Sequence, residues 1–483
     1  MVRFIGRDKG FSQWHFDSTE SFYCPLEAQQ KTKGLVRSRV TLSSIRSDVL
    51  SFGSLTSARQ PDDPLFRQVV REAATVWSLT EQVQPIHLND LPRYKLDTDT
   101  SSPGLPWRNI GYRTKRQVLD DSEAFKSIRS FWHVIKYGKR KQHPPDCAAF
   151  LRAHLVQEGE CKVRAVWGYP ATIGFQEACF ALPLIEGFTN GKFPIAYGYE
   201  TARGGHLRLL SEYGPKGHFL SSDYRSFDKT IPSWLIRIAF NILALSIDFT
   251  KYRDYGIPDA DALFKAWKYL VHYFIYTPIR LANGERYRKS GGVASGSYFT
   301  QLVDSIVNWI VTVYALRKSG NVVEIIKVLG DDSLVRLQKP LDMEKFEKYS
   351  SELGMIINTA KSQTATSLEF IKFLGYYISN GIPKKPVEEF WAALRFPEYP
   401  DASFDHYATR AMGLLISTFG QHDEFYDIVS SQLSLGFTVR MSPSLRRYCA
   451  ALGIESLPEK PPPIIELGFP AFRDRKVRSR STG

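Results

Sequence analysis

The most informative stretch of the sequence is VLGDDSLVRL, positions 328–337. Two adjacent carboxylates, Asp331 and Asp332, follow Gly330 and lie between two apolar, partly β-branched segments, EIIKVL and SLVRL. A short Gly-Asp-Asp sequence between two such segments predicts a β-hairpin with a tight turn. Gly and Asp are ordinary turn residues, so the hairpin alone does not distinguish an exposed turn from a functional site.

A second pair of carboxylates lies upstream, in SSDYRSFDKTIPSWLI (221–236). Asp223 ends a short predicted strand, HFLSS, and Asp228 follows five residues later, just before a predicted helix. Buried carboxylates without a counter-charge are costly, so several of them at the ends of neighbouring strands indicate a bound cation. Asp223, Asp331 and Asp332 together could hold two Mg²⁺ ions about 4 Å apart, or Mn²⁺ in their place, which is the arrangement that phosphoryl transfer requires.

A third element, RKSGGVASGSYFTQLVDSIVN (288–308), is rich in Gly and Ser over residues 290–297, and a helix is predicted to follow. We call residues 290–297 the Gly/Ser loop. Small residues allow the backbone to approach a ligand closely, and a helix N-terminus favours phosphate. Each of the three elements is weak evidence alone, because turns and flexible loops are common. Their order and spacing along one chain favour a site for phosphate chemistry.

The composition sets the broad class of the protein. Its 483 residues are enough for about two to four domains, or for one large domain built of subdomains. Hydrophobic residues make up 43% and aromatic residues 13%, so the chain can bury a large core and is not a disordered protein. The net charge of +13 favours a polyanionic partner, nucleic acid first, although charge alone can also serve only solubility.

Cysteine usage and apolar segments predict the environment of the chain. The five Cys residues are scattered without a C-x-x-C pair, so neither a zinc site nor a disulfide framework is expected, and a reducing compartment fits best. The N-terminus MVRFIGRDKG lacks the apolar segment of a signal peptide. The longest apolar stretch, 306–316, is too short to span a bilayer. We therefore expect a soluble, intracellular protein without membrane association.

Helices are predicted on both sides of the carboxylate region. Residues 63–79 have Asp63 as N-cap, a Pro at the first helical position and apolar residues at helical spacing. Residues 85–115 are punctuated by Pro and Gly and are predicted to be loop. The tail RDRKVRSRSTG is predicted to be disordered, with a contact to RNA as the alternative. Between 217 and 376 strands and helices should alternate, and helices are predicted over 298–318, 341–353, 404–419, 423–435 and 443–452.

The order D-x-x-x-x-D, S-G-x-x-x-T and G-D-D resembles the palm motifs of viral RNA-dependent RNA polymerases. The segments SFDKTIPSWLI, SGSYFTQLVDSIVN and VLGDDSL are most similar to polymerases of the partitiviruses, small viruses with segmented double-stranded RNA genomes. The resemblance covers about residues 100–376. It implies an α+β right-hand polymerase fold with fingers, an antiparallel-sheet palm and a mostly helical thumb. The implied division is an N-terminal region and fingers over 1–216, palm over 217–234, a fingers insertion over 235–286, palm again over 287–380, and thumb with the basic tail over 381–483.

The resemblance also implies catalytic roles. Asp223 and Asp331 would be the principal metal ligands, and Asp332 would assist them. Adjacent residues of a strand point to opposite sides, so Asp331 and Asp332 are not expected to be equivalent. Lys361, in GMIINTAKS, matches the lysine proposed as general acid for the pyrophosphate leaving group. An exposed lysine without a catalytic role is the alternative.

Sugar recognition carries a departure from the family pattern. Asp228 matches the residue that senses the ribose 2′-hydroxyl of the incoming nucleotide, a position that is usually aromatic in reverse transcriptases. Asp304 stands where Asn is usual, and Ala294 stands where Pro is common. Two carboxylates near one sugar would repel each other, so a basic neighbour, a water or a proton is expected between them. The implied nucleotide-binding residues are Lys162, Arg164, Asp228, Ser295, Gly296, Thr300, Asp304 and Asn308.

Three further segments extend the resemblance. In EGECKVRAVWGYP, Lys162 and Arg164 share one face of an extended strand and could present two cations to phosphates, with a solvated basic face as the alternative. KFLGYYISNG (372–381) resembles the hairpin at the primer end, and its aromatic residues are expected in the core. TSSPGLPW (100–107) resembles the loop that guides the template, which implies template contacts at Thr100, Ser101, Pro103 and Gly104.

Taken together, the resemblance implies an RNA-dependent RNA polymerase that replicates and transcribes a viral double-stranded RNA genome by two-Mg²⁺ nucleotidyl transfer from NTPs. The implied partners are single- and double-stranded RNA, NTPs and a viral capsid protein, inside the virion in the host cytoplasm. Two other classes stay open. A reverse transcriptase or another palm polymerase would incorporate dNTPs. A non-enzymatic basic RNA-binding or capsid protein would bind RNA without metal-dependent synthesis.

Overall fold

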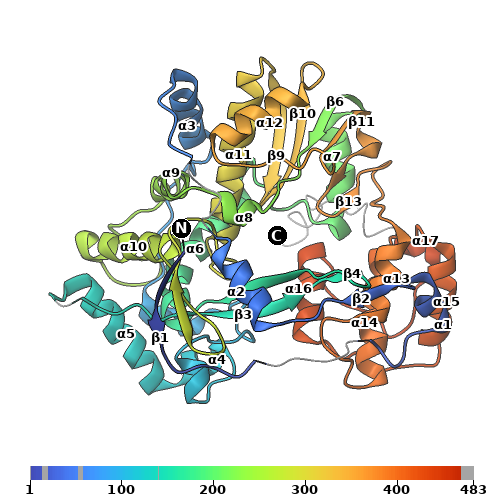
Figure 1. Cartoon of the computed structure of the whole chain (residues 1–483), viewed down its shortest axis with the longest axis horizontal. Coiled ribbons are helices and arrows are strands. Elements are labelled where there is room, and N and C mark those ends of the chain that lie inside the picture. Colours follow the sequence, from blue (N-terminus) through green and yellow to red (C-terminus); the bar gives the residue numbers. More distant parts are fainter. Residues whose placement is uncertain (1, 14–19, 53–57, 140, 469–483) are drawn as a thin grey trace.

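The computed structural model describes residues 2–13, 20–52, 58–139 and 141–468. The basic tail that the sequence predicts to be disordered, at the end of the chain, lies outside the described residues. Figure 1 shows a sheet with its covering helices at the top, a second group of strands across the lower half and the C-terminal helices at the lower right. The three groups together position the candidate site.

The upper sheet contains the strands predicted around the carboxylates. Its order is β11–β6–β10–β9, and each neighbouring pair is antiparallel. The antiparallel sheet expected for a palm is therefore present, and it brings the first carboxylate motif beside the hairpin. The strands are β6 (Lys216–Ser221), β9 (Val323–Leu329), β10 (Asp332–Leu337) and β11 (Gln363–Ser367).

The two central strands of this sheet, β6 and β10, contribute side chains to cores on both of its faces. Leu220 and Val335 are a cross-strand pair that packs into the large core with α11 and α12. Phe219 and Leu334 contribute to a separate core with α7. Because side chains alternate along a strand, neighbouring residues serve two different cores. The helices are α7 (Gly205–Tyr213), α11 (Thr300–Lys318) and α12 (Met343–Glu352).

A five-stranded sheet with the order β1–β8–β7–β3–β5 forms the lower strand group. Strand β1, near the start of the chain, pairs with β8, so the N-terminal segment completes a sheet made by much later residues. The strands are β1 (Arg3–Arg7), β3 (Cys147–Ala153), β5 (Val163–Gly168), β7 (Pro278–Arg280) and β8 (Glu285–Arg288).

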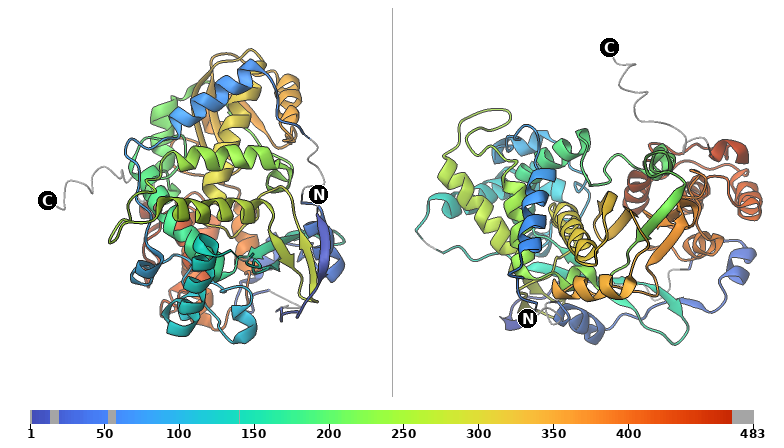
Figure 2. Two further views of the ribbon diagram at one scale, coloured as in Figure 1. Left: turned by 90° about the vertical axis from the view of Figure 1, so that its left-hand side faces the viewer. Right: turned by 90° about the horizontal axis from the view of Figure 1, so that it is seen from above.

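Helices pack around these strands, and Figure 2 shows α9 and α10 lying one above the other in its left view. The segment 85–115, predicted to be loop, contains two short 3₁₀ helices, η1 and η2. The predicted N-cap of α3 is confirmed, since the Asp63 carboxylate accepts the Phe66 N–H at 2.8 Å. The elements are α2 (Leu42–Leu50), α3 (Pro64–Val76), η1 (Leu88–Arg93), η2 (Trp107–Ile110), α4 (Lys115–Asp120), α5 (Ser122–Tyr137), α6 (Ala171–Asn190), η3 (Thr201–Arg203), α8 (Phe227–Thr230), α9 (Ser233–Ala244), α10 (Ala260–Ile275) and η4 (Leu368–Phe370).

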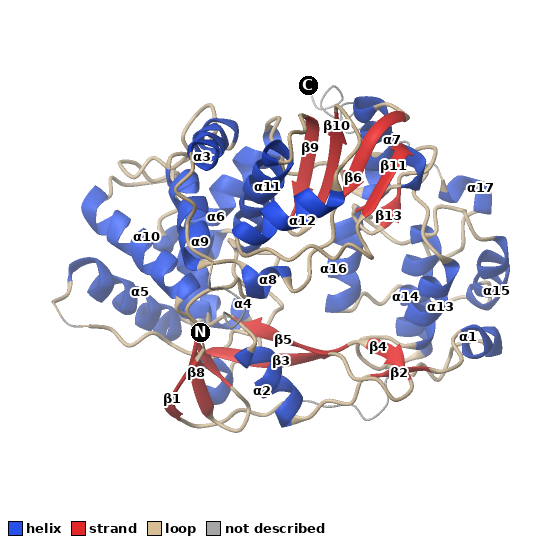
Figure 3. Ribbon diagram, turned by 45° about the horizontal axis from the view of Figure 1, so that its top comes forward, coloured by secondary structure: helices blue, strands red, loops and turns tan. Residues whose placement is uncertain are grey.

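The helices predicted after residue 400 are confirmed, and they enclose a core of their own with Trp391, Met412 and Val429. Figure 3 shows these helices on the right, together with α1 from the N-terminal region. Ala28 of α1 belongs to the same core. The helices are α1 (Leu26–Lys31), α13 (Val387–Arg395), α14 (Phe404–Ser417), α15 (Asp423–Leu433), α16 (Pro443–Leu452) and α17 (Ile464–Leu467).

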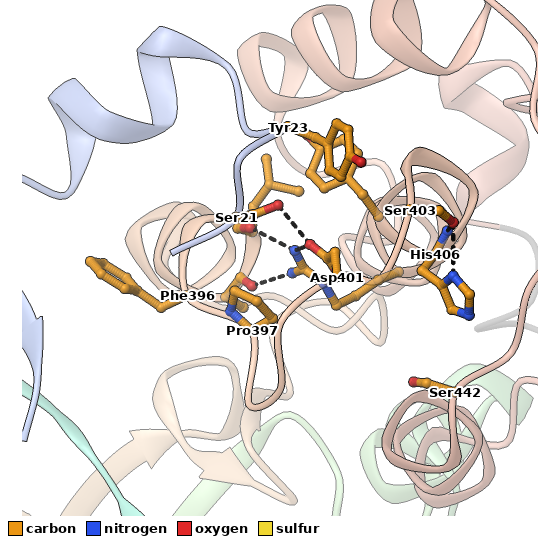
Figure 4. A network of polar contacts seen from close by, with 12 residues as sticks. Ser21, Tyr23, Phe396, Pro397, Asp401, Ser403, His406 and Ser442 are labelled. Carbon is orange, nitrogen blue, oxygen red and sulfur yellow. Dashed lines mark hydrogen bonds and ion pairs between the residues drawn. The ribbon is translucent and has the colours of Figure 1, made fainter. Parts of the chain in front are cut away.

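The N-terminal region ties the lower strands to the C-terminal helices. Strand β2 (Leu35–Arg37) pairs with β4 (Leu155–Gln157), and the Arg37 guanidinium donates to the Phe396 carbonyl at 2.8 Å. Figure 4 shows Ser21 facing Asp401, to which its hydroxyl donates at 2.6 Å. Residues 20–37, whose role the sequence leaves open, therefore connect strand β4 with the C-terminal helices, two parts that lie far apart along the chain.

The hairpin predicted after residue 371 is present as β12 (Lys372–Phe373) and β13 (Tyr376–Tyr377). Of its three aromatic residues expected in the core, Phe373 and Tyr376 are buried, whereas Tyr377 is half-buried. The five Cys residues, all in the described part, are free. In the part of the chain that the structure describes, no helix has both the length and the apolar character needed to cross a membrane.

Candidate active site

The turn that carries the adjacent carboxylates is a two-residue loop between β9 and β10. Leu329 pairs with Asp332, which leaves Gly330 and Asp331 in the loop. Gly330 has a φ of 61°, as the first position of a type II′ hairpin turn requires. Its N–H donates to Ser305 Oγ on α11 at 2.9 Å. The helix therefore fixes the backbone just before Asp331.

Asn308 holds the same turn. It is fully buried, and its amide donates to the carbonyls of Gly330 at 2.9 Å and Asp332 at 3.1 Å, while its Oδ1 accepts from Thr312 at 3.0 Å. The nucleotide contact predicted for Asn308 does not fit this placement, since both amide hydrogens and the carbonyl oxygen are engaged inside the protein. Ser305, Asn308 and Thr312 share one face of α11, but this helical spacing does not reveal that the face holds the turn.

Asp223 lies across from the hairpin, on the chain just after β6. The β6–β10 register, continued past the end of β6, places Asp223 opposite Asp332. A buried hydrogen bond of 2.5 Å between the Oγ atoms of Ser222 and Ser333 agrees with the same register. Directly opposed residues of an antiparallel pair lie on one face, so Asp223 and Asp332 face the same side while Asp331 lies in the turn.

The backbone around Asp223 is held by the segment that contains Lys361. The Asn358 N–H donates to the Asp223 carbonyl at 2.8 Å, and the Asp223 N–H donates to Ser362 Oγ at 3.0 Å. Lys361 lies within this segment, and its side chain is exposed. The structure therefore places the predicted general acid on the turn that clasps the Asp223 strand end.

Asp223, Asp331 and Asp332 lie near one another at the ends of β6 and β10, close enough for their charges to interact. Burial by the surrounding protein, followed by the charges of Asp331 and Asp223, raises the pKa of Asp332 to about 7. Burial also raises the pKa of Asp331, and Asp223 adds to this rise. The side chains of Asp331 and Asp332 are nevertheless exposed, so protein reduces their hydration while a ligand can still reach them. In the described part of the chain, no group of three or more Asp, Glu, His or Cys side chains lies close enough together to hold a metal ion.

Asp228 and Asp304 form the carboxyl pair for which the sequence predicts an intervening proton, water or cation. Asp304 is 5% exposed and is hydrogen-bonded to Asp228. Burial, then the charges of Asp228 and Asp331, raises the pKa of Asp304 well above the usual range of a carboxyl. A proton on Asp304, donated to Asp228, removes the repulsion. Burial, followed by the charge of Asp331, raises the pKa of Asp228 to about 6, and the charge of Arg164 opposes this rise.

Replacing Asp304 by Asn should remove the pH dependence that this proton imposes on stability. A carboxyl whose pKa is raised in the folded state stabilises the fold only at low pH, and this stability is lost as pH rises through the folded pKa. Asn donates the same hydrogen bond without a proton to lose. The free energy of unfolding of Asp304→Asn should exceed that of wild type by a gap that widens between pH 5 and 8, by at most about 1.4 kcal/mol per pH unit. Urea denaturation measures it, and a constant gap would contradict the assignment.

The Gly/Ser loop passes closely against strand β5 before it enters α11. Gly296 has a φ of +108°, and a Cβ there would lie 2.2 Å from the Trp167 carbonyl oxygen. Thr300 Oγ1 donates to the Ala294 carbonyl at 2.9 Å, which closes the loop onto the first turn of the helix. Ser295 is half-buried and Gly296 is exposed, so this part of the loop presents small groups to the site.

The predicted pair of cations, Lys162 just before β5 and Arg164 on it, is exposed, and its members act on different neighbours. Arg164 lies close enough for its charge to oppose the rise in the pKa of Asp228 and of Asp331. Burial, with Arg164 and Lys162 among the nearby cations, lowers the pKa of His154 to about 4. The structure therefore places Arg164 near the carboxylates and Lys162 among the cations around His154.

Lys372 also acts on the carboxylates, although it is not among the site residues predicted from the sequence. Its charge partly offsets the rise in the pKa of Asp332. Its carbonyl accepts the Ser221 hydroxyl at 2.8 Å, which ties the β12–β13 hairpin to β6. A single lysine at the start of KFLGYYISNG carries no sequence signal of this position.

The predicted template-guiding loop is anchored at its second half. Pro103 and Gly104 are buried, and the first residue of α6, Ala171, donates its N–H to the Pro103 carbonyl at 2.7 Å. Thr100 is exposed and Ser101 is half-buried. The first half of the loop is therefore the part that a strand of nucleic acid could contact.

Comparisons with known proteins show the family of this chain. The family model for viral RNA-dependent RNA polymerase matches residues 23–433. The chain is 27% identical over 371 residues to the RNA-directed RNA polymerase of Cryptosporidium parvum virus 1, covering 71% of this chain and 66% of that protein. It is 25% identical over 291 residues to the RNA-directed RNA polymerase of White clover cryptic virus 1, covering 54% and 47%. The chain thus spans about half to two thirds of the length of these curated relatives.

A solved structure shows the same fold. The crystal structure of the RNA-dependent RNA polymerase of a human picorbirnavirus has a TM-score of 0.62 and 16% sequence identity, and the match covers 85% of this chain and 76% of that one. The predicted α+β polymerase fold is therefore confirmed. The matched family segment contains the carboxylates, the Gly/Ser loop and Lys361. The chain belongs to the family of viral RNA-dependent RNA polymerases.

Proposed function

We propose that this chain is an RNA-dependent RNA polymerase that adds nucleotides from NTPs to an RNA strand opposite an RNA template. The observation that carries the proposal is the meeting of Asp223, Asp331 and Asp332 at neighbouring strand ends, with Arg164 in electrostatic reach. Metal-assisted phosphoryl transfer uses several neighbouring carboxylates that the cations of the protein do not neutralise, because the metal ions supply the positive charge. Membership of the polymerase family supports RNA as template and product.

The donor chemistry fits two Mg²⁺ ions, or Mn²⁺ in their place, because these ions prefer oxygen ligands. Burial, with the neighbouring carboxylates adding to it, raises the pKa values of Asp331 and Asp332, and a bound cation would offset both effects. Asp223 and Asp331 would be the principal ligands, and Asp332 would assist. Such ions, when bound, supply activation of the 3′-hydroxyl and neutralisation of the leaving pyrophosphate.

The cations around the carboxylates have separate roles in this proposal. Arg164, with Lys162 beside it, binds the triphosphate of the incoming nucleotide. Lys361 protonates the leaving pyrophosphate from the turn beside Asp223. Ser295, Gly296 and Thr300 shape the wall against which the nucleotide lies, and Thr100 and Ser101 contact the template strand.

Asp228 should decide between ribose and deoxyribose. Because Asp304 carries the shared proton, Asp228 keeps an acceptor for the 2′-hydroxyl. A hydrogen bond to a charged group contributes about 1.5–3 kcal/mol, so Asp228→Ala should lower the preference for NTP over dNTP by about 10- to 100-fold. Incorporation of single GTP and dGTP residues measures the ratio of kcat/KM values. Asp261→Ala, an exposed change in the first turn of α10, is the matched control, and an unchanged ratio in Asp228→Ala would contradict the role.

The two alternative classes make different predictions. A reverse transcriptase would prefer dNTPs. Such enzymes usually have an aromatic residue where this chain has Asp228, and the Gly before Asp331 also argues against this class. A non-enzymatic RNA-binding protein would leave the carboxylate group and its clamped turn without a purpose. It would bind RNA but would make no product when a divalent metal is added.

RNA-templated synthesis tests the proposal. The purified chain would receive an annealed RNA primer and template, four NTPs and Mg²⁺ or Mn²⁺. We expect a product of template length, and omission of one NTP should stop synthesis at the first complementary template base. RNA binding without extension under these conditions, or faster extension with dNTPs, would contradict the proposal.

The biological setting is part of the same proposal. The chain would replicate and transcribe a viral double-stranded RNA genome, and would bind both single- and double-stranded RNA. Its net charge of +13 supports a nucleic-acid partner. Its protein partner would be a viral capsid protein. The chain would act inside the virion, in the host cytoplasm.

A further inference from the structure

Two buried ionisable residues lie behind the Gly/Ser loop, outside the carboxylate site. Lys115, at the start of α4, is 5% exposed, and Glu177, on α6, is 1% exposed. Lys and Glu side chains are almost never fully buried without a specific reason. Burial lowers the pKa of Lys115 and raises the pKa of Glu177 to about 8, so the interior disfavours the charge on both side chains. Neither residue belongs to the polymerase motifs, and the proposed chemistry uses neither of them.

Glu177 holds the junction between the Gly/Ser loop and α11. Its Oε2 accepts the Ser297 hydroxyl at 2.5 Å, and its Oε1 accepts the Tyr298 N–H at 3.4 Å. Ser297 Oγ accepts the Phe299 N–H at 3.1 Å. A carboxyl group on α6 thus fixes the last residue of the loop and, through it, the two residues that lead into the helix.

Lys115 reaches both of the loops proposed to contact RNA. Its backbone N–H donates to the Ser101 carbonyl, in the template-guiding loop, at 2.9 Å. Its Nζ lies 5.7 Å from the centre of the Tyr298 ring, just after the Gly/Ser loop. The Tyr298 hydroxyl is hydrogen-bonded to Thr98, just before the template-guiding loop. Lys115 and Tyr298 therefore connect the two loops by two separate routes.

We propose that Lys115 and Glu177, which both lie against Tyr298 at the junction, are positioning residues that fix the spacing between the template-guiding loop and the Gly/Ser loop, and so set the grip on a single-stranded RNA template. The inference rests on the proposed polymerase function. Replacement of either side chain removes one support of the junction, so Tyr298, which is hydrogen-bonded to Thr98, can shift. A shift of Tyr298 changes the distance between the two loops and with it the path of the RNA between them.

The test separates template affinity from nucleotide affinity. Wild type is compared with Lys115→Met, which keeps the aliphatic length, with Glu177→Gln and with the double variant. Residues in one polar network couple strongly, so the Kd of a fluorescent single-stranded RNA should rise about tenfold in each single variant. The KM for NTP on template-saturated complexes should change by less than about twofold, well below that coupling. The effects of the two single changes should be non-additive in the double variant, because both side chains act through Tyr298.

The control is Lys126→Met, the same change at an exposed position of α5, which should bind RNA like wild type. An unchanged Kd in the folded variants would overturn the proposal, and so would equal rises in Kd and KM, which a general loss of structure produces. If a buried variant does not fold, Tyr298→Phe and Thr98→Val test the same connection, and their effects on Kd should be non-additive. Additive effects, or none, would overturn the proposal.

RNA binding does not depend on catalysis, which keeps the two proposals separate. A wild-type chain that binds RNA but does not extend a primer would contradict the polymerase function. The comparison of Kd values between wild type and Lys115→Met would still decide whether Lys115 positions the loops.

Discussion

Asp331→Asn should abolish RNA synthesis and leave the fold intact. The change removes one negative charge and one proposed metal ligand, but it keeps the size of the side chain. Metal-assisted stabilisation is worth several kcal/mol, so the rate of nucleotide addition should fall at least about 10³-fold. Burial and the charge of Asp223 raise the pKa of Asp331, so a neutral Asn should leave the metal-free protein at least as stable as wild type.

Two measurements check this expectation. Single-turnover extension of an annealed RNA primer gives the rate, and urea denaturation in EDTA gives the free energy of unfolding. Asp332→Asn should lose less activity than Asp331→Asn, because Asp332 only assists. Asp261→Asn, on the exposed side of α10, is the control for loss of one carboxylate. A rate for Asp331→Asn within about tenfold of wild type would contradict its role as a principal ligand.

Gly296→Ala should be nearly as damaging, for a steric reason. At a φ of +108°, a Cβ would lie 2.2 Å from the Trp167 carbonyl oxygen, so the Gly/Ser loop must move away from β5. A displacement of about 1 Å near reacting groups can reduce a rate by about 100-fold, and the strained backbone adds about 1–3 kcal/mol of destabilisation. Single-turnover extension and thermal unfolding measure the two effects.

Gly111→Ala is the matched control for this change. Gly111 has almost the same φ, +109°, but a Cβ there would meet no atom within 4 Å. The control therefore contains the backbone strain without the close contact. Similar losses of activity in the two variants would show that strain alone, and not the approach of the loop to β5, explains the effect.

The hairpin and the helices could be predicted because the sequence encodes them locally. Apolar segments on both sides of Gly330 specify the strands, and Gly at the first turn position permits the two-residue loop. Asp63 followed by a Pro specifies the start of α3. The proton shared by Asp228 and Asp304 follows from the same kind of reasoning, since two neighbouring carboxylates must be neutralised in some way.

The clamps and the buried pair could not be predicted, because they depend on contacts between distant segments. Resemblance to a motif places Asn308 near the site, but it does not tell whether the amide faces a ligand or the hairpin backbone. Lys115 and Glu177 look like ordinary helix charges in the sequence, and only the folded chain places them in the interior beside Ser297 and Tyr298. Lys372 acts on Asp332 through a hairpin whose position depends on the whole sheet.

Anomalous diffraction from crystals with Mn²⁺, an annealed RNA primer and template, and a non-hydrolysable NTP analogue tests the central claim most directly. Manganese scatters anomalously, so each ion can be located without assumptions about its ligands. We predict two peaks about 4 Å apart, in contact with carboxylate oxygens of Asp223 and Asp331. Crystals that contain RNA and nucleotide but show no anomalous peak at these carboxylates would contradict the account.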